Sequence, residues 1–544
     1  MEQFTHLFPK TCPCNEILAV DVERERSYHS WIAKDALMAI SCIQGLVNRE
    51  ESKKIYLINY PNEHDWDIYP SDQQALEQEG FFPVPHSYAK LDNTKTFPAL
   101  DFLLKEYHHK IKGVVLCPPL TELVCDGAIM AAVTACAQLS AIPVSQHMHL
   151  LIKEAGYDFP VLDDTRNLKT NIEAFDWSYE NYFNDKVNPM YIGHHSITAF
   201  GGRLEDQFTS IYDYFMATCP FVFCLNGNYP EERAKLNQIL NESNYPLSTP
   251  VLGLPVDEGE GLETIEEIGY YFVIANVHNF SCTSAFPSDL SLVPKLPEPK
   301  VYELDQNDVA LSFYVTDGDS LAFPAFHHYH DMVDTPKSDV PIGWSFNPLT
   351  FTLYPSMFYW RWQYRTDIYE PVLDWNDQRQ MGTLQRMSPK SWDICCGQIK
   401  NYFEKLGMYS TNYFFGDINF IQQIEPVCQI KGYGSDPGYL TKIARVNDSV
   451  SISLTGTVTD TSVRQMVENV EAAMSYQQSG NRPTYVMLVN GSGCVRHHNG
   501  ESAYRAGETV RRLREKYPDK RFVLMRPCDM AVSYLNHEKK RKGE

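Results

Sequence analysis

The chain has 544 residues and carries 47 basic against 69 acidic side chains, a formal net charge of −22 at pH 7. This length exceeds what one ordinary core supports, so we expect two or three domains, and the hydrophobic content of 43% suffices for large cores. The acidic balance argues against a nucleic-acid binder or an anionic-membrane binder, because phosphates require a basic face.

The termini and the apolar segments favour a cytoplasmic protein. Residues 1–14 lack both the basic start and the apolar core of a secretory signal, although a trimmed exported protein would look the same. The most apolar window, 127–144, is interrupted by Gln138 and Pro143, which is typical of a buried helix running into a strand and not of a membrane span. The 14 cysteines are scattered through apolar runs, as expected of core residues in a reducing compartment.

The first half of the chain alternates strand-like and helix-like segments. The pattern predicts a helix over 127–139 and strands at 55–59, 111–116, 142–145, 221–226 and 270–276. This alternation favours βα units and a mostly parallel sheet, the α/β class. No dinucleotide-binding fingerprint or phosphate loop accompanies these segments.

A domain boundary is expected at 287–308. This stretch carries four prolines and no helical or alternating periodicity, which predicts an extended segment on the surface. We therefore expect an N-terminal α/β region over 1–295, with a further division near 165, and a C-terminal domain over 296–544.

The second half alternates in the same way and predicts a (β/α) barrel-like domain, with an open doubly wound sheet as the alternative. Helices are expected at 462–476 and 504–517, and Ser388 is placed to cap a third helix that begins at Pro389. The predicted strands are 310–315, 342–346, 409–415, 449–454, 484–489 and 521–525, with a weaker one near 427–431.

An apolar run ends abruptly in Thr316-Asp317-Gly318-Asp319-Ser320. In βα folds, functional groups gather at the carboxyl ends of the strands, where Asp317 and Asp319 are expected. Gly318 between them allows the backbone to turn sharply. Two close carboxylates can bind a divalent cation, divide into a protonated acid and an ionised base, or simply hold a turn and cap the next element. All three interpretations remain open on these residues alone.

Other polar and aromatic residues follow the remaining predicted strands. If parallel strands deliver them to one mouth, their carboxylates and amides can meet hydroxyl groups, and an aromatic ring can stack on the C–H face of a sugar. These groups predict a carbohydrate substrate or ligand. The residues are Trp344, Asn347, Glu370, Asp417, Asn490, His497 and Asp529.

The segment Phe326 to Asp331, "FHHYHD", offers an alternative as a metal site. His327 and His330 lie three residues apart and could complete a His-His-Asp set with Asp317 or Asp319. A polar surface turn is the more common setting for such histidines. The leading prediction therefore involves no cofactor, and a divalent metal belongs to the alternative.

Several motifs resemble those of the GxGYxYP group of glycoside hydrolases over most of the chain. The segment 42–50, "CIQGLVNRE", is similar to the N-terminal "LQGLVNR" element of that family, and "FYVTDGDSLAF" is similar to its "DGDN" strand end, with Ser320 in place of Asn. The segments "VLGLPVDEGEG", "NVHNFSC", "IGWSFNP" and "RFVLMRPCDM" resemble further landmarks. The naming motif should fall at 370–392, where only Pro389 and Trp392 remain. The resemblance implies the two-part fold and a glycoside hydrolase activity.

The resulting prediction is a carbohydrate-active hydrolase of glycosidase type. Asp317 and Asp319 would provide one carboxylate, and Asp417, Glu370 or Asp529 the other. One alternative is a metal-dependent sugar deacetylase-like hydrolase. Another is a non-catalytic carbohydrate-binding or scaffold protein, which the loss of the naming motif favours.

Overall fold

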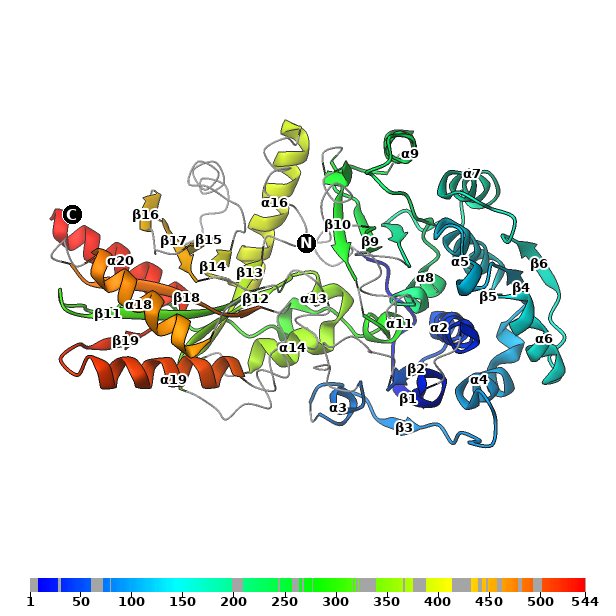
Figure 1. Ribbon diagram of the computed structural model, residues 1–544, viewed down its shortest axis with the longest axis horizontal. Helices are drawn as coiled ribbons and strands as arrows, with labels where there is room; N and C mark the ends of the chain where they lie inside the picture. Colours follow the sequence, from blue (N-terminus) through cyan, green and yellow to red (C-terminus); the bar gives the residue numbers. More distant parts are fainter. Residues whose placement is uncertain are drawn as a thin grey trace. The chain divides into compact units, whose positions relative to one another are not determined.

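The structure is a computed structural model in which the chain forms two compact units (Figure 1). The first unit comprises Met1–Ser288 and Thr350–Phe358, and the second comprises Asp289–Leu349 and Tyr359–Glu544. The structure describes residues 8–27, 31–59, 72–78, 80–197, 209–242, 245–256, 264–266, 269–275, 277–316, 318, 321, 339–364, 367–374, 388–412, 432–438, 443–446, 449–456, 462–477, 482–492 and 501–543.

The first unit is built from parallel sheets whose strands alternate with helices, which confirms the predicted class of this region (Figure 1). Its described residues form three sheets, with strand orders β2-β1-β3, β5-β4-β6 and β10-β9-β7-β8. Strands that are buried along their length, such as β4 and β9, suit parallel sheets covered by helices. The strands are β1 (Glu16–Asp21), β2 (Lys53–Ile58), β3 (His86–Tyr88), β4 (Gly113–Leu116), β5 (Ala141–Val144), β6 (Val161–Asp164), β7 (Ile192–His195), β8 (Val222–Phe223), β9 (Pro250–Leu254) and β10 (Tyr271–Ile274).

A long buried helix, α2 (Trp31–Glu50), is central to this unit. Almost every residue from Ala33 to Asn48 is buried, as expected of a helix surrounded by other elements. A Cβ on Gly45 would lie 2.5 Å from the Cβ of Met216 in α8, closer than side chains approach one another. The other helices are α1 (Glu23–Ser27), α3 (Asp72–Glu77), α4 (Pro98–Tyr107), α5 (Gly127–Leu139), α6 (Gln146–Glu154), α7 (Asn171–Tyr182), α8 (Tyr212–Thr218), α9 (Pro230–Glu242), α11 (Phe280–Thr283) and α13 (Thr350–Leu353).

The second unit holds a curled, half-barrel sheet that agrees with the barrel-like prediction. Its strand order is β12-β13-β14-β15-β17-β18-β11-β19, and β16 pairs antiparallel with β17. Because β18 pairs along one edge of β11 and both β12 and β19 pair along the other, the sheet curls back on itself. The strands are β11 (Val309–Thr316), β12 (Ile342–Phe346), β13 (Tyr369–Asp374), β14 (Ser410–Asn412), β15 (Gly432–Gly438), β16 (Ile443–Val446), β17 (Ser449–Thr455), β18 (Thr484–Ser492) and β19 (Phe522–Leu524).

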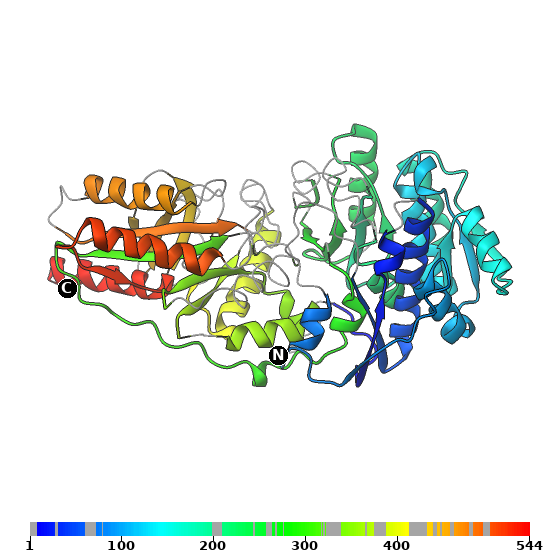
Figure 2. The same ribbon diagram turned by 60° about the horizontal axis from the view of Figure 1, so that its bottom comes forward.

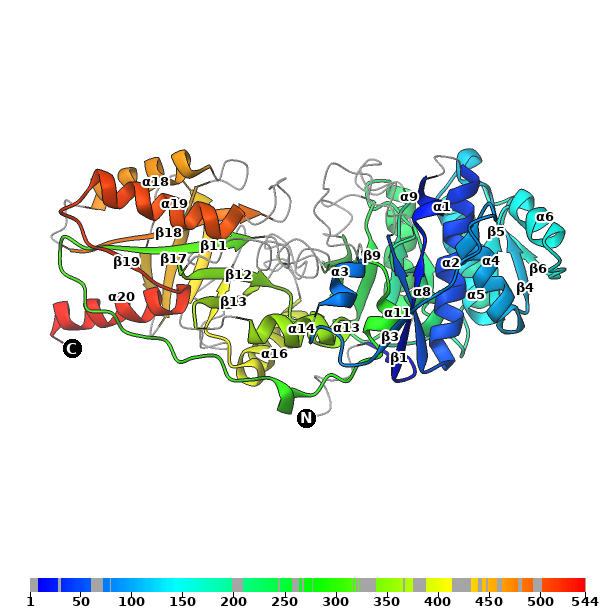
Figure 3. The ribbon, with the colours of Figure 1, turned by 90° about the horizontal axis from the view of Figure 1, so that it is seen from below.

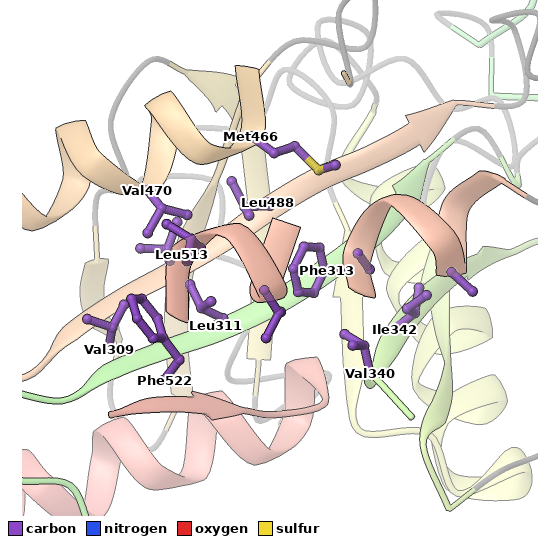
Figure 4. Close-up of a cluster of buried hydrophobic side chains, with 14 of the residues drawn as sticks. Val309, Leu311, Phe313, Val340, Ile342, Met466, Val470, Leu488, Leu513 and Phe522 are labelled. Carbon is purple, nitrogen blue, oxygen red and sulfur yellow. The ribbon is translucent and has the colours of Figure 1, made fainter. Parts of the chain in front are cut away.

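Alternation along β11 divides the core of this unit between the two faces of the sheet. Leu311 and Phe313 point to the face covered by α18 (Val463–Gln477) and α19 (Glu501–Lys516), where they pack in the cluster of Figure 4. Tyr314 points to the opposite face, where α20 (Pro527–Lys542) packs. Figure 3 shows α18 and α19 on one side of the sheet and α20 on the other. The remaining helices are α14 (Pro355–Gln363), of which residues from Tyr359 onward belong to this unit, and α16 (Pro389–Leu406), which begins at the predicted proline.

An extended segment without helix or strand runs from Val293 to Asp308 (Figure 2). It is fastened to α20 by backbone and side-chain groups: the Lys300 N–H donates to Asp529 at 2.7 Å, and the Tyr302 N–H donates to Ser533 at 2.9 Å. The extended conformation predicted for 287–308 is confirmed from 293 to 308, whereas Leu290–Leu292 form a short 3₁₀ helix. No helix among the described residues has the length and apolar character needed to cross a membrane.

Candidate functional site

The carboxyl ends of β11, β12 and β18 meet at one edge of the curled sheet. The Thr316 hydroxyl at the end of β11 donates a 3.3 Å hydrogen bond to the Gly491 carbonyl of β18. In register, Val315 lies opposite both Trp344 of β12 and Gly491 of β18. Polar groups that follow these three strands therefore share an edge, as parallel strands require.

Gly318 lies against the end of β12. A Cβ at this position would sit 2.6 Å from the Phe346 nitrogen and closer still to the carbonyl group of Ser345. Glycine is required because the backbone of one strand end approaches that of the next too closely for any side chain. This explains the glycine between the two aspartates by close packing. Asp317 and Asp319 themselves lie outside the described residues.

Two of the predicted ligand-binding residues at the end of β12 have structural roles instead. Trp344 is only 1% exposed and packs edge-on against Tyr369 at 5.8 Å between ring centroids, so its ring offers no open face for a sugar. Asn347 is fully buried, and its side-chain oxygen accepts the Leu349 N–H at 2.9 Å, which shapes the turn after β12. The alternation of apolar residues along β12 points Trp344 into the core. The prediction considered only that Trp344 lies near the end of a strand and overlooked this alternation.

The structure brings a buried arginine, which the sequence analysis did not identify, to the same strand end. Arg361 of α14 donates a 2.9 Å hydrogen bond to the Ser345 carbonyl, and its guanidinium lies 5.2 Å from the centroid of the Phe346 ring. Burial lowers the pKa of Arg361 to about 9, a lowering that Tyr314 opposes, so the group stays charged at neutral pH. Arg361 therefore places a positive charge next to the Ser345 carbonyl, the group that a Cβ on Gly318 would meet.

A second buried arginine braces the end of β18. Arg505 of α19 donates to the Asn490 carbonyl at 2.6 Å and to the Ser502 hydroxyl at 3.2 Å. The Asn490 amide in turn donates to the Ser502 carbonyl at 2.8 Å. Asn490 is therefore at the expected strand end, but it is fully buried and its amide nitrogen bonds to the start of α19.

Glu370 lies away from the carboxyl ends of the strands. In register it is opposite Gly343, three residues before the Phe346–Leu373 pair, which corresponds to about 10 Å along the strand. Its carboxylate accepts the Cys528 N–H at 2.8 Å, at the start of α20. Burial raises the pKa of Glu370 above its usual value, and the Cys528 N–H opposes that rise. Glu370 therefore caps α20 beside Asp529 and lies away from the edge where β11, β12 and β18 end.

Asp529 is likewise removed from the shared edge and anchors the extended segment. It pairs with Arg526 through two hydrogen bonds of 3.0 and 2.8 Å and also accepts the Lys300 N–H. The β19 strand that precedes it pairs with β11 only as far as Leu311, five residues or about 16 Å before Thr316. The Asp529–Arg526 pair is only 3% exposed on each side. The sequence predicts correctly that Asp529 follows a strand. The pairing of β19 with the first part of β11, however, places that strand end far from the ends of β11, β12 and β18.

The remaining predicted site residues lie outside the described residues. They are Asp417, His497 and the two alternative metal ligands His327 and His330. Within the part of the chain that the structure describes, no group of three or more His, Cys, Asp or Glu side chains could hold a metal ion.

No family model and no curated protein matches the chain. Among solved structures, the chain is similar to one described as a "putative hydrolase" from Bacteroides thetaiotaomicron VPI-5482, with a TM-score of 0.74. The two share 17% sequence identity, and the match covers 97% of this chain and 96% of the other. This likeness shows a shared fold across both units. A match to Cwp6 from Clostridium difficile, at 8% identity over 93% of this chain and 75% of that one, has a TM-score of 0.27, too low to support an argument.

Proposed function

We propose that the chain is a carbohydrate-active hydrolase of glycosidase type whose carboxylates follow β11. In this proposal Asp317 and Asp319 supply one acidic group, and Asp417, after β14, supplies its partner. Hydrolysis of a glycosidic bond requires two carboxyl groups, one that protonates the leaving oxygen and one that acts as a base or nucleophile.

The close approach of Gly318 to β12 is the observation that carries the proposal. Its neighbours in the chain are both aspartates, and the backbone contact with Ser345 and Phe346 is at the edge where β11, β12 and β18 end. In α/β folds with parallel strands this edge is where ligands bind.

The two buried arginines add a chemical argument. Arg361 and Arg505 each donate to a backbone carbonyl at the end of a strand and bring positive charge to this edge. A nearby guanidinium favours the ionised form of a carboxylate, whereas a second carboxyl farther from it can remain protonated. Such a separation of pKa values is what glycosidase chemistry demands of its two acids. The solved structure with the same fold is described as a "putative hydrolase", which supports hydrolysis as the general class of reaction.

The proposal is tested by assaying the purified protein for reducing ends released from a panel of oligosaccharides and aryl glycosides. Asp317→Asn and Asp319→Asn should each lower turnover by roughly 10² to 10⁴-fold, the usual contribution of a general acid or base. The exposed Asp305 provides a matched control, and Asp305→Asn should leave turnover unchanged. Full turnover in both active-site variants would refute the role of these carboxylates.

One alternative is a non-catalytic carbohydrate-binding protein, which the absence of the family's Gly- and Tyr-rich loop at 370–392 favours. Calorimetric titration with the same glycans distinguishes it, because binding would then persist in Asp317→Asn while the wild type shows no turnover. The metal-dependent deacetylase-like alternative, with His327 and His330, predicts release of acetate and loss of activity on treatment with a chelator.

A further inference from the structure

Two thiols that are far apart in the sequence come together in the first unit, whereas the groups used in the proposed function belong to the second. Cys14 lies two residues before β1, and Cys282 lies in α11. Cys14 packs against the core cluster that contains Cys282. Cys14 is half-buried and can be reached from solvent, whereas Cys282 is completely buried.

The segment that carries Cys14 is held against α11 by hydrogen bonds. The Thr11 hydroxyl donates to the Ser281 carbonyl at 2.8 Å, and both groups are buried. The Ser281 hydroxyl accepts from the Asn48 amide at 2.8 Å and donates to Asp213 at 2.6 Å. These bonds hold the residue next to Cys282 against the segment that carries Cys14.

A buried lysine lies beside the thiols. Lys54 of β2 is completely buried, and its ammonium donates to the Asn48 carbonyl. Burial lowers the pKa of Lys54, while the neighbouring Cys12, Cys282, Cys14 and Glu51 favour its charged form. A cation at this place favours a thiolate over a thiol.

The two thiols differ in their readiness to ionise. A hydrogen bond from Cys282, together with the charge of Lys54, lowers the pKa of Cys14, although partial burial opposes both. Burial raises the pKa of Cys282 well above its usual value. Cys14 therefore ionises before Cys282.

We propose that Cys14 and Cys282 form a redox pair that a hydroperoxide oxidises to a disulfide, with Cys14 as the attacking and Cys282 as the resolving thiol. In the first step the Cys14 sulfur bonds to one peroxide oxygen as the O–O bond breaks. The departing hydroxide takes a proton to form water, which leaves a sulfenic acid on Cys14. In the second step the Cys282 sulfur bonds to the Cys14 sulfur, and the sulfenic oxygen leaves with the Cys282 proton as a second water. Two thiols and one hydrogen peroxide thus give one disulfide and two waters.

The disulfide would link the N-terminal segment to α11. The two cysteines, at positions 14 and 282, are 268 positions apart in the chain. A cross-link that closes so long a loop restricts the unfolded chain strongly. The oxidised protein is therefore expected to unfold at a higher temperature than the reduced protein. This inference does not depend on the proposed hydrolase activity.

The test uses the full chain, reduced and then treated with one equivalent of hydrogen peroxide. After the remaining thiols are blocked, peptide mass spectrometry should detect a peptide in which Cys14 is linked to Cys282. In Cys282→Ser, dimedone should instead trap a sulfenic acid on Cys14, because the resolving thiol is missing. Lys54→Met should slow alkylation of Cys14 and move its pH profile to higher pH.

Cys125 provides the matched control within the same molecule. It is half-buried like Cys14, but burial raises the pKa of its thiol. Because the pKa of Cys14 is lowered and that of Cys125 is raised, Cys14 holds the larger thiolate fraction at pH 7 and should be alkylated faster than Cys125. Equal rates for Cys14 and Cys125, or peroxide products on Cys14 without the link to Cys282, would overturn the proposal. Circular dichroism of each variant ensures that the rates compare folded proteins.

Discussion

Removal of the Asp529 carboxylate tests whether this residue anchors the fold or binds a ligand. Asp529→Ala leaves the Arg526 guanidinium, which is 3% exposed, without its buried carboxylate partner and takes the acceptor from the Lys300 N–H. Loss of one partner of a buried ion pair costs about 3–5 kcal/mol, and the lost backbone hydrogen bond adds about 1 kcal/mol. At about 2–4 °C per kcal/mol for a unit of this size, Tm should fall by roughly 8–24 °C.

The assay is thermal unfolding followed by circular dichroism, with Lys540→Ala as the control. Lys540 also joins α20 to the extended segment through Glu303, but this pair is exposed, so its loss should cost less than about 1 kcal/mol. If Asp529→Ala unfolds at the same temperature as the control, the anchoring role is refuted. A variant that keeps its stability but loses carbohydrate binding would return Asp529 to the ligand site.

Three further predictions concern steric contact and pH. Gly45→Ala should lower the free energy of unfolding by about 1–3 kcal/mol, because its Cβ would press on Met216 of α8. Denaturant unfolding measures this change, and an unfolding curve equal to that of the wild type would contradict the packing. Gly318→Ala should destabilise the second unit by a similar amount, because the new Cβ would meet the backbone at Ser345. Limited proteolysis under mild denaturation would detect this loss of stability as faster cleavage. A cleavage rate equal to that of the wild type would argue against the close approach. Burial raises the pKa of Asp35 to about 6, and Ser145 opposes the rise. Because this value lies above the unfolded pKa near 4, the folded state favours the neutral acid. The contribution of Asp35 to the stability of the folded state is therefore complete below about pH 4 and is lost as the pH rises through about 6. Asp35→Asn should therefore raise Tm relative to the wild type at pH 8 but not at pH 4, and an equal shift at both pH values would exclude this cause.

The sequence predicts the elements whose local signals agree with their packing. The proline at 389 begins α16 as expected, and the helical spacing of Met466 and Val470 corresponds to the face of α18 that packs on the sheet. These elements are predictable because the apolar periodicity that defines a helix also defines its buried face. The α/β class and the mostly parallel pairing follow in the same way.

Elements whose tertiary contacts override local propensity were missed. The β15 strand has the sequence "GYGSDPG", in which glycine and proline argue against a strand, yet it pairs with β14 and β17. A shift in register between Ser435 and Gly438 accommodates the irregular part. Arg361 and Arg505 were missed because arginines on helices are usually exposed, and no local pattern shows that these two turn inward.

The candidate site was only partly predictable because position along a strand depends on register. The sequence singles out Gly318 as a point where the backbone turns sharply, whereas the structure explains the glycine by the close approach of its backbone to Ser345 and Phe346. The sequence cannot show that Glu370 lies opposite Gly343, or that β19 pairs only with the first part of β11. Those pairings remove Glu370 and Asp529 from the edge where β11, β12 and β18 end.

The most direct test of the proposed function is a comparison of glycan turnover by the wild type, Asp317→Asn and Asp305→Asn under identical conditions. We expect the wild type and Asp305→Asn to release reducing ends at equal rates, and Asp317→Asn to be slower by roughly 10² to 10⁴-fold while it remains folded. Equal rates in all three proteins, or no turnover of any glycan by the wild type, would contradict a carboxylate-based hydrolase site at the end of β11.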